Sequence, residues 1–373
     1  MGRPRALEKL DQATVNHGLV VLIVFALSAG SSAFFVRRTI VLSHRLGILD
    51  RPGARSAHHR IVPRMGGVAM LLAFLLGLGA TFSLNVDRFP AETERLLLLA
   101  IAVSILTIIM VYDDALDVSA WSKLVWQCGI ALIVVLPRLR GPSHGIVIDR
   151  VNVPFVGSVT VPLVIALVAS VIWLVGFANA LNFVDGLDGL AGSLTVVACA
   201  VLFAHTYFRP ALDPQFTISL VPLALGAAVI GFLPFNWHPG KIIMGDAGAQ
   251  FLGFTLAATS IIGGAKIATA LLALGLPALD LIWVVLDRAT HGSSPMRADR
   301  RHLHHRLVDL GWSHQQVVYF MAGISALFGS AAIFLPSRGS KLVALGLVAV
   351  VLLITLISTA KASHRRTGRT VSE

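Results

Sequence analysis

Apolar residues along this chain form long runs, and short polar segments carry most of the charge between them. About 20 apolar residues cross the hydrocarbon core of a bilayer as a helix, and the longer runs reach that length. The pattern therefore predicts an all-α polytopic membrane protein with about eleven transmembrane helices. The runs lie near residues 17–42, 65–84, 96–112, 121–137, 159–178, 187–206, 217–234, 248–265, 267–286, 315–336 and 340–360.

The first apolar run follows a polar, partly basic segment, an order that also occurs in signal peptides. The run is too long for the apolar region of a signal peptide and further spans follow it, so we expect a retained helix. No internal repeat or Pro/Ser-rich linker divides the chain. We expect a polar N-terminal segment over 1–16, one transmembrane domain over 17–360 and a basic tail over 361–373.

Composition agrees with this class of protein. Apolar residues make up 56% of the chain and charged residues only 13%, against about 25% charged in soluble domains, which excludes a soluble globule, a disordered chain and a coiled coil. Cys128 and Cys199 both lie in apolar runs, so no disulfide framework or thiolate metal site is expected. The net charge of +11 is better explained by basic residues that flank spans and meet anionic lipid than by nucleic-acid binding.

Basic residues concentrate in the loops after the first and ninth runs and in the tail. An odd number of spans places these three segments on one side, which the positive-inside rule identifies as cytoplasmic. The N-terminus is then outside and the C-terminus cytoplasmic. The longest outer connection, residues 145–161, alternates apolar and polar positions around Pro154 and Gly157, which predicts a short β-hairpin on the outer face.

Acidic residues gather at the predicted cytoplasmic ends of the spans, where a charge is expensive and usually has a purpose. Asp113, Asp114 and Asp117 end the third span. Asp113 and Asp117 share a helix face, where like charges repel unless a cation lies there or one carboxyl stays protonated. Considered alone, an ordinary solvated helix end explains this group about as well.

The segment 179–191 is rich in Asn, Asp and Gly between two apolar runs. Its glycines allow a ligand to approach the backbone, and its oxygen-bearing side chains suit Mg²⁺. Asp246, between glycines at another span junction, fits one further metal ligand. The candidate residues of the segment are Asn179, Asn182, Asp185, Gly186 and Asp188.

A fourth polar segment, residues 299–306, combines histidine and arginine. A zinc site is one interpretation, but no H-E-x-x-H pattern or cysteine partner is present, and Arg with His suits a diphosphate better. A topology signal would explain the arginines but not three histidines. The candidates are Arg301, His302, His304 and His305.

The basic loop over 46–67 is by itself adequately explained as a topology signal. It contains His58 and Arg64, and with Lys123 at the start of the fourth span these residues are candidates for binding a lipid phosphate.

These five segments, in this order, resemble the polyprenyl-phosphate N-acetylhexosamine-1-phosphate transferase family, glycosyltransferase family 4. The resemblance extends from about Leu46 to Arg306, and the H-x-H-H form at 302–305 is similar to the branch that starts O-antigen and teichoic-acid linkage units. It implies a bacterial inner-membrane enzyme with cytoplasmic active-site loops. Its reaction would transfer N-acetylhexosamine 1-phosphate, with N-acetylglucosamine as the expected sugar, from a UDP-sugar to polyprenyl (undecaprenyl) phosphate and release UMP.

The resemblance also implies roles for single residues. Asp113 or Asp114, with Asp117 in the same motif, would serve the lipid phosphate, and Asp113 is the preferred base. Mg²⁺, replaceable by Mn²⁺, would be held by Asp246 with Asn182. The remaining members of the 179–191 segment and the histidine segment would bind the nucleotide and the sugar diphosphate. Family precedent also implies a homodimer. The chain departs from the family at Ile243, where the family often has a Phe that stacks on uracil.

Without the resemblance, a transporter or flippase for an anionic or lipid-linked solute is the alternative, because it too places ionisable groups within a helical bundle. Transporters usually hold their site near mid-membrane and often contain inverted repeats. Here the carboxylates gather at one face and no repeat is visible, which favours an enzyme. A purely structural membrane protein has no need of the polar clusters.

Overall fold

The computed structural model describes residues 5–50, 61–84, 86–116, 118–153, 157–208, 215–264, 267–290, 302–335 and 338–370. Within these ranges the chain is almost entirely helical, with two small antiparallel hairpins. The helices are α1 (Arg5–Leu46), α2 (Gly66–Ser83), α3 (Pro90–Leu116), α4 (Ala120–Val135), the 3-10 helix η1 (Leu136–Arg140), α5 (Leu163–Val184), α6 (Leu190–Tyr207), α7 (Phe216–Asn236), α8 (Gly245–Ile262), α9 (Ile267–Thr290), α10 (Leu303–Asp309), α11 (His314–Phe334) and α12 (Arg338–Thr370).

Each predicted apolar run coincides with a long helix, and the short helix α10 was not predicted. Eight helices of the described residues, α1 to α7 and α11, are long and apolar enough to cross a membrane. Shorter apolar segments lie in α9 and α12. The protein is therefore an all-α polytopic membrane protein, as predicted, while the count of eleven spans stays a prediction.

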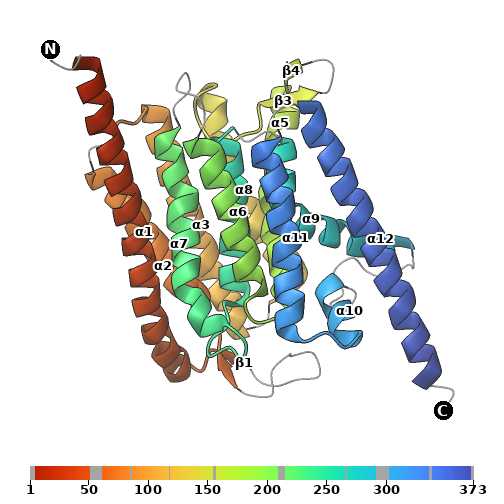
Figure 1. Cartoon of the computed structure of the whole chain (residues 1–373). Coiled ribbons are helices and arrows are strands. Elements are labelled where there is room, and N and C mark those ends of the chain that lie inside the picture. Colours follow the sequence, from red (N-terminus) through yellow and green to blue (C-terminus); the bar gives the residue numbers. More distant parts are fainter. Residues whose placement is uncertain are drawn as a thin grey trace.

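The long helices form a bundle whose two termini lie at opposite ends (Figure 1). Near the end that holds the N-terminus, strands β3 (Arg150–Val153) and β4 (Gly157–Thr160) pair antiparallel. This confirms the hairpin expected in the loop over 145–161; its placement outside the membrane stays a prediction. Near the other end lie α10 and the small hairpin of β1 (Leu49–Asp50) with β2 (Val62–Pro63).

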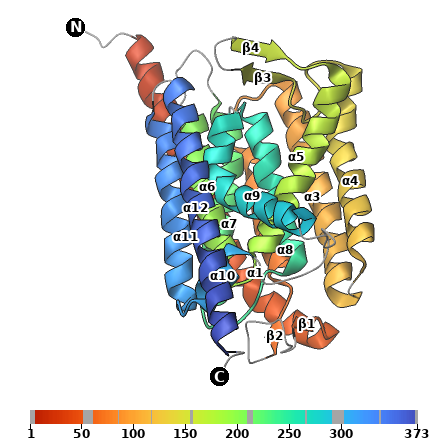
Figure 2. The ribbon, with the colours of Figure 1, turned by 90° about the vertical axis from the view of Figure 1, so that its right-hand side faces the viewer.

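Helix α8 is the central element of the bundle, because it packs against α2, α3 and α5 and is buried along nearly its whole length. Its large side chains Phe251 and Phe254 are fully buried. The hydroxyls of Thr255 and Thr259 donate to backbone carbonyls one turn earlier, which satisfies them without a partner from another helix. Helix α9 instead lies obliquely across the bundle (Figure 2). The first turn of α8 is thus a rigid position on which a site can be built.

Candidate active site

Three carboxylates from two helices meet at the end of the bundle opposite the β3–β4 hairpin. Asp113 and Asp114 lie at the end of α3, and Asp246 lies in the first turn of α8. One oxygen from each carboxylate lies within 4.8 Å of the others. Among the described residues this is the group that could hold a metal ion, and it unites two motifs that the sequence indicated separately.

Asp114 closes the N-terminus of α8. Its Oδ1 accepts from the backbone N–H of Asp246 at 3.0 Å, and its Oδ2 from that of Ala247 at 3.2 Å. The first N–H groups of a helix have no partner within the helix, and an anion there is also favoured by the helix dipole. Gly245 has φ +71°, and a Cβ at this position would lie 2.5 Å from Asp114 Oδ2. A glycine is therefore required for the carboxylate to approach the helix end.

Two basic side chains lie between the three carboxylates. Arg64 contacts Asp114 Oδ1 through Nε at 3.0 Å and Asp246 Oδ1 through Nη2 at 3.1 Å. Lys123 Nζ lies 2.6 Å from Asp113 Oδ2 and 2.9 Å from Asp246 Oδ2. Burial lowers the pKa of Arg64, but the surrounding carboxylates raise it above its ordinary value, so the guanidinium stays charged. Asp246 is therefore the common partner of both cations.

Accessibility divides this cluster into two layers. The side chains of Asp113 and Asp114 are 1% and 0% exposed, whereas that of Asp246 is 17% exposed. The side chains of Lys123 and Arg64 are 22% and 30% exposed. A molecule that arrives from the aqueous side would thus meet one carboxylate and two cations, with two further carboxylates behind them.

Local structure explains how these side chains come together. The loop before α8 is joined to the strand that precedes Arg64, because the backbone N–H of Ile243 donates to the carbonyl of Pro63 at 2.9 Å. Helix α4 begins after Ser119, whose hydroxyl accepts from the N–H of Ser122 at 3.3 Å, and this start places Lys123 in the first turn.

A layer of amide side chains lies one helical turn from the charged cluster, on the same helix faces. Gln127 follows Lys123 by four residues on α4, and Gln250 follows Asp246 by four on α8. Gln127 Nε2 donates to Gln250 Oε1 at 2.8 Å, and Asn179 Nδ2 donates to Gln127 Oε1 at 2.7 Å. The structure thus places Asn179, a predicted nucleotide contact, in an amide network. Gln127 and Gln250 were not predicted, although their spacing from the charged residues was visible.

The loop after α5 brings two further predicted carboxyl groups to the same region. Burial raises the pKa of Asp185 to about 8, and the negative charge of Asp246 adds to this effect. Asp188 Oδ2 accepts from the backbone N–H of Gly240 at 3.0 Å and contacts His238 Nδ1 at 2.9 Å. Asp188 therefore holds the loop that leads to α8, and His238 is a partner that sequence reasoning missed.

The histidine segment is held in place by a carboxylate on α9. Asp280 Oδ2 lies 2.8 Å from His302 Nδ1, and Asp280 Oδ1 accepts from the backbone N–H of Leu303 at 3.0 Å. The ring of His302 also stacks on Phe183, with centroids 5.3 Å apart. Asp280 lies within α9 and was not among the candidate site residues.

His304 joins the histidine segment to the loop after α5. Its ring is fully buried, and a Cβ at Gly186 would lie 2.2 Å from its Nε2. Burial, with the neighbouring rings of His305 and His302, holds the pKa of His304 well below its ordinary value, so the ring is neutral. Within the described part of the chain neither ring nitrogen has a hydrogen-bond partner. This neutral ring can therefore offer one donor and one acceptor to a ligand.

The remaining candidates are less informative. Asn182 lies in the last turn of α5, where its carbonyl accepts from the N–H of Asp185 at 3.3 Å. Asp117, His58 and Arg301 lie outside the described residues. The donor set as a whole, carboxylate oxygens with Arg, Lys and His nearby, fits a hard divalent cation together with phosphate groups.

Comparison with known proteins agrees with this chemistry. Residues 96–264 match the model of glycosyl transferase family 4. The chain is 31% identical over 305 residues to the "probable undecaprenyl-phosphate N-acetylglucosaminyl 1-phosphate transferase" of Bacillus subtilis (strain 168), covering 79% of this chain and 78% of the relative. It is 30% identical to the decaprenyl-phosphate N-acetylglucosaminephosphotransferase of Mycobacterium tuberculosis (strain CDC 1551 / Oshkosh), covering 90% of this chain and 88% of the relative.

A third relative is the undecaprenyl-phosphate alpha-N-acetylglucosaminyl 1-phosphate transferase of Escherichia coli (strain K12). It is 27% identical, over 87% of this chain and 84% of its own length. These matches favour a transferase over a transporter, and they agree with the resemblance that the motifs indicated. The chain belongs to glycosyl transferase family 4 and is a multi-pass membrane transferase.

Proposed function

We propose that the protein transfers N-acetylglucosamine 1-phosphate from UDP-N-acetylglucosamine to a polyprenyl phosphate, giving polyprenyl-diphospho-N-acetylglucosamine and UMP. The observation that carries the proposal is the layered cluster in which Asp246, Arg64 and Lys123 are accessible in front of two buried carboxylates. The names of the three relatives, which specify a polyprenyl-phosphate acceptor and N-acetylglucosamine, support the choice of substrates.

In this reaction an oxygen of the lipid phosphate attacks the sugar-bearing phosphorus of the donor. A new P–O bond forms there, the P–O bond to the uridylyl phosphate breaks, and UMP leaves with the electron pair. Such transfers need positioning and charge neutralisation more than covalent chemistry from the protein. Arg64 and Lys123 supply positive charge at the accessible layer, where the donor diphosphate and the lipid phosphate would bind.

A divalent cation, Mg²⁺ by our proposal, would be held by Asp246 together with the predicted ligand Asn182, and Asp113 lies close enough to share in its binding. When bound, the cation supplies charge neutralisation at the diphosphate. The residues fit a divalent cation because Asp246, the accessible carboxylate, already contacts two positive groups, Arg64 and Lys123. A metal ion can take the place of these contacts.

We assign the role of base to Asp113 rather than Asp114. Both oxygens of Asp114 accept hydrogen bonds from backbone N–H groups of α8. This carboxylate is therefore engaged in capping the helix. Asp113 accepts one backbone N–H, from Val118, and its other oxygen contacts Lys123. Movement of Lys123 to a substrate phosphate would free that oxygen to orient the lipid phosphate or take its proton.

The histidine segment would bind the sugar diphosphate. His302 is oriented by Asp280, and the neutral ring of His304 can donate to or accept from a hydroxyl or amide of the sugar. Together with Arg301 and His305 this segment would complete the donor site beside Asp185 and Gly186.

The proposed setting is a bacterial inner membrane with the N-terminus outside and the C-terminus cytoplasmic. Residues 17–360 then form one catalytic domain whose active-site loops face the cytoplasm, the side from which a UDP-sugar arrives. The two basic loops and the basic tail support this orientation.

The test is UMP release by the purified, folded protein with polyprenyl phosphate, Mg²⁺ and a panel of UDP-sugars. We expect release with UDP-N-acetylglucosamine, loss of release with EDTA and recovery when Mg²⁺ is returned. Release with a different UDP-sugar alone would contradict the proposed donor. Absence of release with every donor, from protein that elutes as a single folded species, would overturn the reaction.

A further inference from the structure

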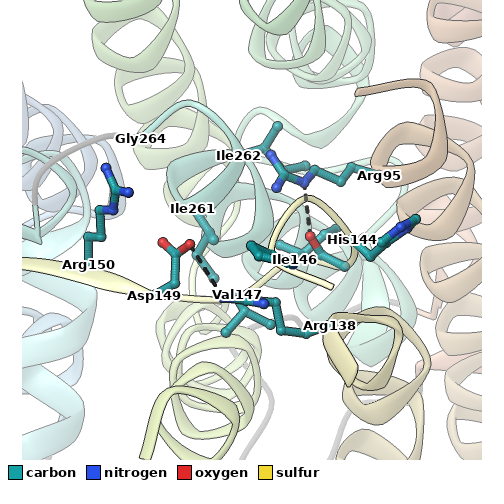
Figure 3. Close-up of a pocket in the computed structure, with 12 residues that line it drawn as sticks. Arg95, Arg138, His144, Ile146, Val147, Asp149, Arg150, Ile261, Ile262 and Gly264 are labelled. Carbon is teal, nitrogen blue, oxygen red and sulfur yellow. Dashed lines mark hydrogen bonds and ion pairs between the residues drawn. The ribbon is translucent and has the colours of Figure 1, made fainter. Parts of the chain in front are cut away.

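A separate cavity of about 250 Å³ opens at the end of the bundle that carries the β3–β4 hairpin (Figure 3). Its walls come from the start of α3, from η1 and the loop after it, from β3, and from the end of α8. Arg95 in this wall and Asp113 in the active site are 18 residues apart on α3, which corresponds to about 27 Å along a helix. The cavity is therefore distinct from the transfer site.

Positive charge dominates the lining of this cavity. Arg95, Arg138 and Arg150 come from three different elements, and Asp149 is the one carboxylate among the described lining residues. Arg95 donates to two neutral carbonyls, those of Gly145 at 2.9 Å and Ser143 at 3.1 Å. These bonds fix the guanidinium, and no carboxylate of the described residues forms an ion pair with it.

The other two arginines are also weakly compensated. Arg138 Nη2 lies 3.9 Å from Asp149 Oδ2, and Arg138 Nε is buried without a hydrogen-bond partner in the described part of the structure. Arg150 is exposed and forms no ion pair with any of the described residues. A buried donor without a partner is unfavourable unless a ligand or water binds it.

Glu94 is not a lining residue, and none of its ion pairs among the described residues involves Arg95, Arg138 or Arg150. Glu94 contacts Arg140 Nη2 at 2.5 Å and His144 Nδ1 at 2.5 Å. Its charge is therefore shared by Arg140, which lies outside the lining, and by His144, which lines the cavity. The lining keeps an excess of positive charge that a bound anion would balance.

The lining also contains the imidazole of His144 and four apolar side chains, those of Ile146, Val147, Ile261 and Ile262. Guanidinium groups match the geometry of phosphate oxygens, and an apolar wall suits the carbon atoms next to a phosphate ester. The volume lies just below the range of pockets that bind drug-sized molecules, so a head group fits better than a larger ligand.

We propose that this cavity binds a phosphate group, carried either by the head group of a membrane lipid or by free phosphate, at the end of the protein opposite the transfer site. Arg138 and Arg150 contact its oxygens, Arg95 orders the loop that forms the cavity, and the isoleucines line the ester side. The site requires no assumption about the transfer reaction.

The test compares the wild type with Arg138→Gln/Arg150→Gln. The matched control is Arg140→Gln, because Arg140 is a nearby arginine whose contact with Glu94 lies outside the cavity lining. Each protein is reconstituted in vesicles of equal parts phosphatidylglycerol and phosphatidylcholine, released under mild conditions, and its bound lipid is counted by native mass spectrometry. We expect the wild type and the control to retain about tenfold more phosphatidylglycerol than phosphatidylcholine. The double variant should retain the two lipids in equal amounts.

A second arm identifies the source of the phosphate. Inorganic phosphate is added to lipid-free protein in detergent, and Tm is compared with that in chloride of equal ionic strength. A Tm increase in the wild type that the double variant lacks, without lipid preference, would assign the site to free phosphate. If the double variant does not fold, Arg150→Gln alone is used, because Arg150 is exposed. Absence of both effects in the wild type, or equal effects in the variant, would overturn the proposal.

Discussion

At one end of the bundle Arg64 and Lys123 lie between three carboxylates, whereas at the other end three arginines share a cavity with Asp149 alone. The ion pairs of the first end are 2.6–3.1 Å long. The one ion pair inside the second cavity measures 3.9 Å. The charges at the first end therefore nearly balance one another. The positive charge at the second end exceeds the negative charge and needs a bound anion to balance it.

This difference in charge balance determines how a phosphate would bind at each end. At the first end a phosphate competes with Asp246 for both cations, so binding is coupled to a rearrangement in which Asp246 gains a new partner such as a metal ion. At the second end the only internal ion pair of the described lining is the long Arg138–Asp149 contact of 3.9 Å, so an anion can bind the arginines without displacing a close carboxylate. The first arrangement suits a substrate that must be selected and released, and the second suits a resident ligand.

The largest effect is expected from Asp246→Asn, which removes the shared partner of both cations at the first end. Turnover should fall at least about 100-fold, as it does when one preorganised electrostatic contact of a transition state is lost. UMP release in excess Mg²⁺ measures it. Asp149→Asn is the matched control, because Asp149 is the carboxylate of the opposite cavity, and its turnover should stay within about twofold. Near-normal turnover of Asp246→Asn would contradict the metal assignment.

The next effect separates two neighbouring carboxylates of the first end. Asp114→Asn keeps one acceptor but loses the charge that faces Arg64 and the start of α8, so the free energy of unfolding should fall by about 1–3 kcal/mol. Asp113→Asn should reduce turnover more strongly while lowering Tm less. Both quantities are measured on the same preparations, by thermal unfolding and UMP release.

Ser313→Ala serves as the control for that pair, because it removes the cap of α11, a helix that contributes no residue to the carboxylate cluster. The opposite pattern, with a stable Asp114→Asn protein that does not turn over and an active Asp113→Asn protein, would exchange the two assigned roles.

Much of this architecture was predictable from periodicity and local chemistry. The eleven apolar runs, the hairpin over 145–161 and the placement of Asp113, Asp114 and Asp246 at span ends on one face all followed from patterns within about 20 residues. A span is defined by its own hydrophobicity, and span ends on one side of a membrane must lie in one layer. The sequence could therefore place the charged groups on one face.

The partners of the charged groups were not predictable in this way. The backbone N–H that Asp114 binds belongs to a residue 132 positions away, and Asp280 on α9 contacts His302 at the start of α10. Asn179 was grouped with the polar loop by proximity in sequence, but it lies within α5 and binds Gln127. Contacts of this kind depend on how helices pack, which no local pattern encodes.

A smaller effect on turnover is expected from Asp280→Asn. The asparagine can still accept from the N–H of Leu303, but it no longer presents a carboxylate to His302, so kcat should fall about tenfold while Tm changes little. A positioning role predicts that kcat and KM for the UDP-sugar change in different proportions. A merely structural role predicts lower Tm with unchanged constants, and that result would contradict the assignment. Asp309→Asn, at the exposed end of α10, is the control.

The smallest effect is expected from Arg140→Gln, which breaks the contact with Glu94 beside the arginine-rich cavity. This contact is shorter than those of Arg64, at 2.5 Å, yet the Arg140 side chain is 62% exposed and Asp114 is fully buried. Exposed ion pairs contribute about 0.2–1 kcal/mol because water screens them, so Tm should fall by less than in Asp114→Asn and turnover should not change. A fall in Tm as large as that of Asp114→Asn would show that distance, rather than burial, sets the strength of ion pairs at both ends.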